Sequence, residues 1–277
     1  MLTPVYRIGA PVSIQGGHWY PVEGHESPYQ QGLWPSVTTI LTATVPKPAL
    51  VPWAKNLALK KVGDYLLNWE AKEGDLEPRT IKGENGIADF QFYTLSLEKT
   101  RAVIEAARRA SDDVREEAAD FGARAHQAIA AWLKGLGEPP GDSDIWPAFD
   151  SFRAWLAGSG WTVVGSELSV FDPAYGFAGT ADMILQRGDA FGVLDLKTSE
   201  GIYSEMAFQV GAYAVGLEAT FGLKVGTAYI LRLPKEIPGK RSSIFELREV
   251  QNLSVAIGAF LTCLLLWEAL RKPLWKE

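Results

Sequence analysis

The sequence contains very little cysteine: Cys263 is the single one among 277 residues. One cysteine cannot form an intrachain disulfide, and it cannot supply the thiolates of an iron–sulfur cluster or of a cysteine-ligated zinc site. The first 17 residues also lack the basic flank and apolar run that mark a secretory signal. These absences indicate a reducing compartment, and we expect a cytoplasmic protein.

Positive charge is also scarce, since 27 Lys and Arg face 33 Asp and Glu, a net charge of −6. No overall field therefore attracts nucleic acid, and a DNA-binding role requires a local basic cluster. A solvated helix face explains each candidate cluster about as well as DNA binding does. The candidates are Lys55, Lys60 and Lys61, then Lys99, Arg101, Arg108 and Arg109. The phosphate-binding motif G-x-x-x-x-G-K-[ST] is absent, so the chain carries no ATP-driven motor of that class.

Apolar periodicity and chain breakers predict a mixed α/β protein. The Gly-, Pro- and aromatic-rich segment 1–35 predicts loop or edge strand, and the polar segment 72–91 predicts a loop or small insertion. A short helix is expected that opens at Ser36 or Thr38 and ends before Pro46. Further helices are expected at 49–69, 96–136, 146–157, 204–221 and 250–270, and strands at 161–171, 180–185, 191–197, 225–233 and 243–247. The β-branched residues of 35–41 are also compatible with a strand, and the helix at 96–136 has a candidate break near Ser111. This order predicts a mixed central sheet flanked by helices, preceded by a largely helical N-terminal half.

The last predicted helix is uncharged from Val250 to Trp267, which raises the question of a membrane span. Its apolar core of roughly 15 residues is shorter than the ~20 that a bilayer requires. We therefore expect a buried helix and no membrane partner.

Two short apolar runs carry Asp182, Asp195 and Lys197, and the turn between them contains Gly188. A hairpin centred between Gly188 and Asp189 places Asp182 opposite Asp195, where two carboxylates repel unless a cation lies between them. The two-residue period of a strand puts Lys197 on the same face as Asp195 and turns Leu194 and Leu196 into a core. Two carboxylates and an ammonium on one face are typical of a divalent metal site that hydrolyses phosphodiesters.

Residues outside the hairpin can complete this site. Gln209 and Tyr213 lie one turn apart on the following helix and can face the same side of the sheet. His126 lies at the edge of an apolar helical stripe, one turn after Gly122, and neutral imidazole is a ligand for Mn²⁺. Two simpler interpretations stay open. His126 could be a structural histidine hydrogen-bonded to a backbone carbonyl, and Glu167 could be a solvent-exposed residue of an edge strand.

The ordered set G-x-x-x-H, G-x-x-D, D-x-K-T and Q-x-x-x-Y resembles the RecB-type branch of the PD-(D/E)xK nucleases. Here the four elements are Gly122–His126, Gly179–Asp182, Asp195–Thr198 and Gln209–Tyr213. The segment PSVTTIL at 35–41 is similar to the N-terminal region of phage and mitochondrial genome-maintenance exonucleases of this branch. Some members hold an iron–sulfur cluster through four cysteines, and this sequence cannot.

The resemblance implies a role for each matched residue. Asp182, Asp195 and the backbone carbonyl of Leu196 would ligate Mg²⁺ or Mn²⁺, with His126 as a further ligand. Lys197 would orient the attacking water and stabilise developing charge. Gln209 and Tyr213 would support the site and contact the scissile phosphate, and Glu167 would be the additional acidic residue of the family.

The resemblance further implies a restriction-endonuclease-like sheet and a metal-dependent DNA exonuclease acting on single-stranded or end-containing DNA, from a phage or a bacterial host. A recombination or replication protein is an expected partner. The predicted organisation is an N-terminal extension and helical region at 1–95 and a nuclease core at 96–277. Two alternatives stay open: a catalytically silent nucleic-acid-binding or recombination-accessory protein on the same fold, and a structure-specific endonuclease.

Overall fold

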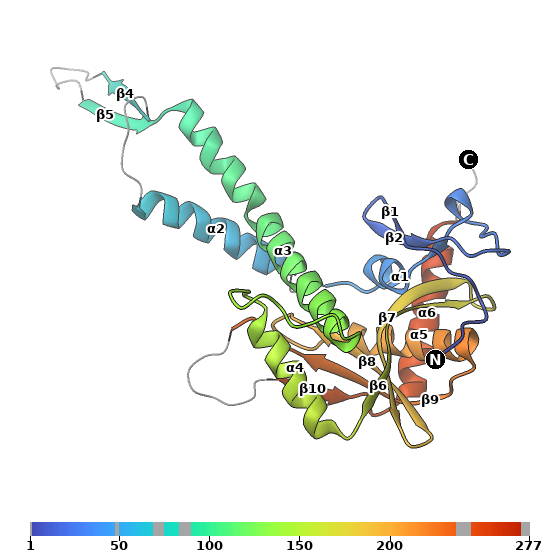
Figure 1. Cartoon of the computed structure of the whole chain (residues 1–277). Coiled ribbons are helices and arrows are strands. Elements are labelled where there is room, and N and C mark those ends of the chain that lie inside the picture. Colours follow the sequence, from blue (N-terminus) through green and yellow to red (C-terminus); the bar gives the residue numbers. More distant parts are fainter. Residues whose placement is uncertain (1, 48–49, 69–74, 83–89, 237–244, 273–277) are drawn as a thin grey trace. The chain divides into compact units, whose positions relative to one another are not determined.

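A five-stranded mixed sheet forms the centre of one of the two units into which the chain divides (Figure 1). The computed structural model describes residues 2–47, 50–68, 75–82, 90–236 and 245–272. One unit comprises Met1–Pro46 with Asp120–Glu277, and the other comprises Lys47–Ala119. Residues 1–46, which the sequence assigned to an N-terminal extension, therefore belong to the unit that contains the sheet.

The sheet has the strand order β10-β9-β8-β7-β6. All neighbours are antiparallel except β8 and β9, which are parallel and are joined by helix α5 (Ser204–Phe221). The strands are β6 (Thr162–Asp172), β7 (Phe177–Arg187), β8 (Ala190–Lys197), β9 (Val225–Arg232) and β10 (Glu246–Glu249). The mixed α/β class predicted from the sequence is confirmed.

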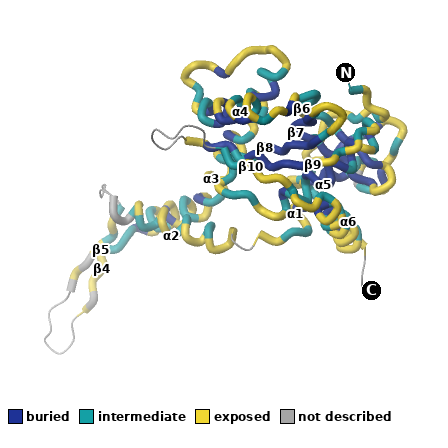
Figure 2. Tube along the Cα trace, turned by 90° about the horizontal axis from the view of Figure 1, so that it is seen from below, coloured by how far each residue is buried: buried dark blue, intermediate teal, exposed yellow. Residues whose placement is uncertain are grey.

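Helices cover both faces of this sheet (Figure 1). One face packs against α1 (Val37–Thr44), α5 and α6 (Leu253–Leu270), and buries side chains such as Ile184 and Val193. The other face packs against α4 (Trp146–Ser159) and the end of α3 (Leu97–Leu133) from Asp120 onward. Leu194 and Leu196 are buried on this second face, as the hairpin argument predicts. Figure 2 shows β7, β8 and β9 largely buried between the two layers.

Helices α5 and α6 pack closely because Gly211 has no side chain. A Cβ atom at Gly211 would lie 2.9 Å from the carbonyl carbon of Ala256 on α6. Helix α6 begins at the side-chain cap of Asn252, which accepts a hydrogen bond from the backbone N–H of Val255.

Helix α6 is half-buried rather than fully buried as predicted. It buries Ala256, Phe260, Leu264 and Trp267. Its opposite side exposes four large apolar residues: Val255, Leu265, Leu266 and Leu270. Within the described residues it is the one helix long and apolar enough to cross a membrane by length and composition, and 22% of that stretch is buried. Core helices pass the same test, so this is weak evidence for a span.

The segment before α1 forms a three-stranded sheet of β1 (Val12–Ile14), β2 (Gly17–Tyr20) and β3 (Trp34–Pro35), with a 3-10 turn at Gln30–Gly32. The side chain of Ser36 caps α1 by accepting a hydrogen bond from the backbone N–H of Thr39 at 2.9 Å. The helical interpretation of the PSVTTIL segment is therefore correct, since α1 follows Ser36 and ends at Thr44, before Pro46.

The second unit contains α2 (Leu50–Asn68), the hairpin β4 (Leu76–Ile81) and β5 (Phe90–Leu95), and the first part of α3. Of the two predictions for 72–91, a loop or a small insertion, the loop is wrong for the described part, since six β4 residues pair with six β5 residues. Residues 72–74 and 83–89 of that prediction lie outside the described residues. The candidate break near Ser111 is also absent, because α3 is continuous there.

Candidate metal centre

Three carboxylates occupy matching positions on three neighbouring strands. The β6–β7 register pairs Ser166 with Met183 and Leu168 with Ala181, which sets Glu167 across from Asp182. The β7–β8 register pairs Met183 with Leu194, and one further step sets Asp182 across from Asp195. The predicted register of the hairpin is therefore correct. Like charges so placed repel, and a bound cation removes that repulsion.

The turn that fixes this register is two residues long. Strand β7 ends at Arg187 and β8 begins at Ala190, which leaves Gly188 and Asp189 between them. Gly188 has φ 60°, in the left-handed region that a tight hairpin turn requires and that glycine adopts without strain.

His126 reaches the carboxylates from the C-terminal part of α3. Its Nδ1 lies 3.5 Å from Oδ2 of Asp182 and 3.9 Å from Oε1 of Glu167. One ligand atom from each of these three residues lies within 4.8 Å of the other two. Its Nε2 lies 3.2 Å from the carbonyl oxygen of Leu196, so the carbonyl contact foreseen as an alternative is present as well.

Gly122, one turn before this histidine, lies close to Thr198, since a Cβ atom at Gly122 would lie 3.1 Å from the Thr198 hydroxyl oxygen. The sequence spacing Gly122–His126 thus corresponds to a close approach between α3 and the end of β8.

Asp195 is fully buried and held by partners from two elements. Its Oδ2 forms an ion pair with Nζ of Lys197 on the same strand, and its Oδ1 accepts a hydrogen bond from Nε2 of Gln209 at 3.0 Å. The same Gln209 nitrogen lies 2.9 Å from the hydroxyl oxygen of Tyr213, one turn along α5. The structure therefore brings Asp195, Lys197, Gln209 and Tyr213 together.

Asp182 and Leu196 connect the two groups. Oδ2 of Asp182 accepts a hydrogen bond from the backbone N–H of Leu196 at 2.7 Å, while the Leu196 carbonyl faces His126. All eight residues singled out as site candidates from the sequence thus lie in one connected cluster. Within it, His126, Glu167 and Asp182 are the residues close enough to share one ion, whereas Asp195 points to Lys197 and Gln209.

Burial and mutual repulsion shift the acid–base properties of the cluster. Burial raises the pKa of Asp195 to about 6, although the Lys197 charge opposes the rise. Burial, with a smaller contribution from the Asp182 charge, raises the pKa of Glu167. Burial alone would lower the pKa of Lys197, but the charges of Asp195 and Asp182 outweigh it and raise that pKa. Lys197 is therefore a stable ammonium at neutral pH, suited to donating hydrogen bonds and neutralising charge.

His126, Glu167 and Asp182 form a donor set that could hold one metal ion. With bonds of about 2.1 Å, two ligands of one octahedral ion lie between about 3 and 4.2 Å apart. The two distances from Nδ1 of His126 fall in that range. Two carboxylates and one imidazole are oxygen and nitrogen donors, which several divalent metals accept.

Glu167 has an unusual backbone for a strand residue, with φ 53° in the left-handed region. A non-glycine residue there is uncommon, and such strain concentrates at functional sites. The sequence matched Glu167 to the acidic residue of the family, but nothing in it signals this conformation.

Sequence analysis missed two hydroxyl residues beside the cluster. The Tyr20 hydroxyl lies 2.9 Å from the Thr180 hydroxyl oxygen. Thr180 precedes Asp182 by two residues, so strand periodicity could have placed it on the same face. Tyr20 comes from the distant β2 strand and carries no local signal.

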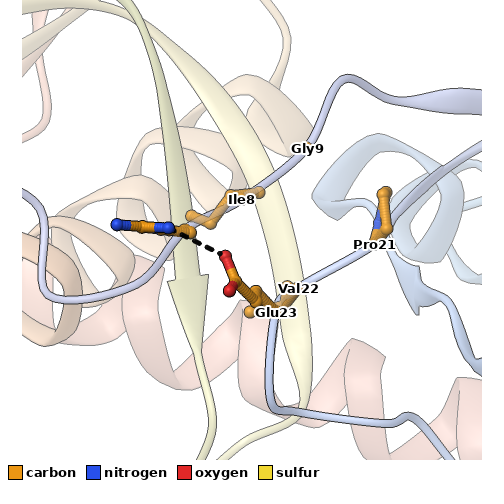
Figure 3. A pocket seen from close by; sticks show the side chains of 6 residues that line it. Ile8, Gly9, Pro21, Val22 and Glu23 are labelled. Carbon is orange, nitrogen blue, oxygen red and sulfur yellow. Dashed lines mark ion pairs between the residues drawn. The ribbon is translucent and has the colours of Figure 1, made fainter.

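Figure 3 shows a hollow that is lined by none of the residues of the carboxylate cluster. It is lined by Arg7, Ile8, Gly9, Pro21, Val22 and Glu23. Its charged groups, Arg7 and Glu23, pair with each other at 3.5 Å and are both well exposed. It offers no group of residues suited to metal binding or acid–base chemistry.

The basic clusters expected for DNA binding lie in the second unit. Lys55, Lys60 and Lys61 are exposed on α2. On α3, Arg108 is paired with Glu105 at 2.9 Å, and the helix also carries many acidic residues. Helix α2 is thus the better candidate for a basic surface.

Comparison with known proteins adds little to this geometry. No family model and no curated protein matches the sequence. A solved structure described as the crystal structure of SSO0001 is similar over 80% of this chain and 96% of its own, with 14% identity and a TM-score of 0.29. A similarity this weak carries no argument about function.

Proposed function

We propose that the chain is a metal-dependent DNA exonuclease with a restriction-endonuclease-like core, of the RecB-type branch of the PD-(D/E)xK nucleases. The observation that carries the proposal is the row of Glu167, Asp182 and Asp195 on adjacent strands, with Lys197 and His126 beside it. A structural ion-pair network explains Asp195 and Lys197, but it does not explain why Glu167 and Asp182 face each other and a histidine.

In this proposal His126, Glu167 and Asp182 hold Mg²⁺ or Mn²⁺, with Asp195 and the Leu196 carbonyl adjacent. The ion would neutralise phosphate charge and favour ionisation of the attacking water. Water oxygen forms a bond to phosphorus as the opposite phosphorus–oxygen bond breaks, and the leaving oxygen takes a proton. The Lys197 ammonium stabilises the charge that develops on the phosphate oxygens.

Gln209 and Tyr213 act as positioning residues. Gln209 holds Asp195 by its 3.0 Å hydrogen bond, and Tyr213 shares the same amide nitrogen. Burial raises the pKa of Tyr213 well above its usual range, so its phenol stays neutral and able to donate a hydrogen bond.

DNA is the proposed partner, although the chain is acidic overall. Helix α2 carries three exposed lysines (Lys55, Lys60 and Lys61) and one acidic residue, Asp64. Lysine side chains neutralise DNA backbone phosphates without recognising the base sequence, and such binding weakens with added salt.

Digestion of linear and closed circular DNA by the purified protein tests the proposal. With Mn²⁺ or Mg²⁺, linear strands should be degraded and circles spared, and chelation should abolish the reaction. Asp182→Asn should be inactive, whereas Asp150→Asn, an exposed change on α4, should match the wild type. Equal cleavage of circles would contradict the exonuclease and favour an endonuclease. DNA binding without any cleavage would favour the silent binding protein.

A further inference from the structure

A small cavity with several hydroxyl groups among its lining residues adjoins the carboxylate cluster. It has a volume of ≈120 Å³ and collects residues from β2, α1, β7 and α5. Its lining residues are His18, Tyr20, Ser36, Val37, Thr38, Gly179, Thr180 and Tyr213. Five of these carry hydroxyls, and no carboxylate or ammonium is among them.

The cavity and the candidate metal centre are neighbours through Tyr213. This residue lines the cavity, and its hydroxyl oxygen lies 2.9 Å from the Gln209 nitrogen that donates to Asp195. Thr180, on another wall, lies two residues before Asp182 on β7. A group bound in the cavity therefore lies beside the reacting phosphate rather than at a remote site.

The size of the cavity limits what it holds. Water takes about 30 Å³ in the liquid, so the space corresponds to about four water molecules. Sites for nucleoside-sized or drug-sized ligands are larger, at about 300–1,000 Å³. One tetrahedral phosphate group fits this size, and a nucleobase with its sugar does not.

Hydrogen-bond donors remain available on these walls. Tyr213 accepts from Gln209, so its own hydrogen is not used in any bond seen among the described residues. In the Tyr20–Thr180 pair only one hydroxyl donates, which leaves the other hydrogen uncommitted. Thr38 is exposed, and its hydroxyl lies 3.0 Å from that of Ser36, so it can rotate toward a ligand. Several donors that converge without an opposing carboxylate suit phosphate oxygens.

Gly179 keeps this space open. A Cβ atom at this position would lie 2.9 Å from Cε1 of Tyr213 and 3.3 Å from Cγ2 of Val37. Both of those residues line the cavity, so a larger side chain would fill or distort it.

We infer that this cavity binds one phosphate group of the DNA strand, next to the phosphate that is cleaved. The inference rests on the proposed function, because it assigns a second phosphate of the same substrate. The bound phosphate is either the terminal phosphate of a strand end or an internal phosphodiester, since both present the same oxygens to the hydroxyl groups.

The test compares Thr38→Val and Thr180→Val with Thr42→Val. Thr42 is an exposed threonine on α1 that does not line the cavity, so its substitution is a matched control. Thermal unfolding should first show that all three variants fold. Binding of a labelled single strand is then measured in Ca²⁺, and cleavage separately in Mn²⁺. Three strands are used: with a 5′-phosphate, with a 3′-phosphate, and with hydroxyls at both ends.

We expect the dissociation constant to rise about tenfold or more for Thr38→Val and Thr180→Val, the loss expected for one hydrogen bond to a charged group. The kcat value should stay within about twofold of the Thr42→Val value, since these hydroxyls bind rather than react. Loss confined to one phosphorylated strand identifies a terminal phosphate, and equal loss on all three identifies an internal one.

Unchanged affinity of both variants on all three strands, relative to Thr42→Val, would overturn the inference. Absence of binding of any strand by the wild type would overturn it as well. Binding that depends on Thr38 and Thr180 without cleavage by the wild type would support the phosphate site and reject the nuclease. Cleavage by the wild type together with unchanged affinity of both variants would reject the phosphate site alone.

Discussion

Glu167 of β6 and Asp182 of β7 lie directly opposite each other, and both carboxylates lie close to Nδ1 of His126. Without a bound cation such a pair destabilises the fold, because like charges across two strands repel. The left-handed backbone of Glu167 adds a further cost. A divalent ion shared by the three residues would offset both the charge repulsion and the backbone strain.

Glu167→Gln should weaken divalent metal binding. The amide keeps the size of the side chain but removes one of the two negative charges opposite His126, so affinity for Mn²⁺ should fall about tenfold to a hundredfold. Calorimetric titration with Mn²⁺ measures this. Glu23→Gln, an exposed change at the hollow paired with Arg7, is the control. Equal affinity of Glu167→Gln and the control would remove Glu167 from the metal site.

Metal affinity should depend on pH near 6. Cations bind ionised carboxylates, and burial raises the pKa of Glu167, a member of the group of three. Burial also raises to about 6 the pKa of Asp195, whose charge lies beside that group and adds to its attraction for a cation. Affinity should therefore be full at pH 7.5 and fall as pH drops through about 6, whereas ordinary aspartates would lose their charge only near 4. Mn²⁺ titrations between pH 5 and 8 check this, and a flat profile over that range would contradict it.

The same raised pKa has a consequence for the metal-free protein. Folded Asp195 holds its proton more tightly than the unfolded chain does between about pH 4 and 6, so its contribution to stability falls as pH rises through that window. Because Mn²⁺ should bind more tightly at pH 7.5 than at pH 5, added Mn²⁺ should raise the melting temperature more at pH 7.5.

Lys197→Ala should abolish cleavage while metal binding persists. The ammonium is paired with Asp195 and does not belong to the group of His126, Glu167 and Asp182. Loss of a charged group that stabilises the transition state costs about a hundredfold to a thousandfold in kcat. Single-turnover cleavage and Mn²⁺ titration separate the two effects, with exposed Lys224→Ala as the control. Cleavage at the control rate would place the chemistry elsewhere.

Gly179→Ala should destabilise the fold. The new methyl group would lie 2.9 Å from Cε1 of Tyr213, and overpacking of this kind costs about 1–3 kcal/mol. Gly258→Ala on α6 is the matched control, because a Cβ atom there meets no atom within 4 Å. The control should be neutral or more stable by about 0.5–1 kcal/mol, since alanine favours a helix. Urea unfolding measures both, and equal stability of the two variants would contradict the packing at Gly179.

Local patterns in the sequence predicted the parts of the fold that local chemistry determines. Helix α5 begins and ends at the predicted residues Ser204 and Phe221, where a strong apolar pattern ends at Gly222 in a left-handed cap. The β7–β8 register followed from the two-residue turn at Gly188. Because that register and strand periodicity place Asp182, Asp195 and Lys197, this part of the candidate site was predictable as well.

Other features depend on contacts between distant segments, which one sequence does not display. The hairpin of β4 and β5 was missed because β4, LEPRTI, is largely polar and contains a proline, and because the aromatic β5, FQFYTL, lies mostly beyond the polar segment 72–91. Tyr20 reaches the site from β2 through 160 residues of intervening chain, with no local motif to announce it. The half-burial of α6 also could not be predicted, since its composition is apolar on all sides.

The two-residue turn at Gly188 and Asp189 has a consequence at the opposite end of the hairpin. A strand that slips by one residue turns each side chain to the other face of the sheet. One residue inserted at this turn, on the solvent-exposed rim, would therefore move Asp195 and Lys197 into the apolar layer that now holds Leu194 and Leu196. The length of an exposed loop thus specifies the charge pattern of a buried centre, and this loop should tolerate changes of residue far better than changes of length.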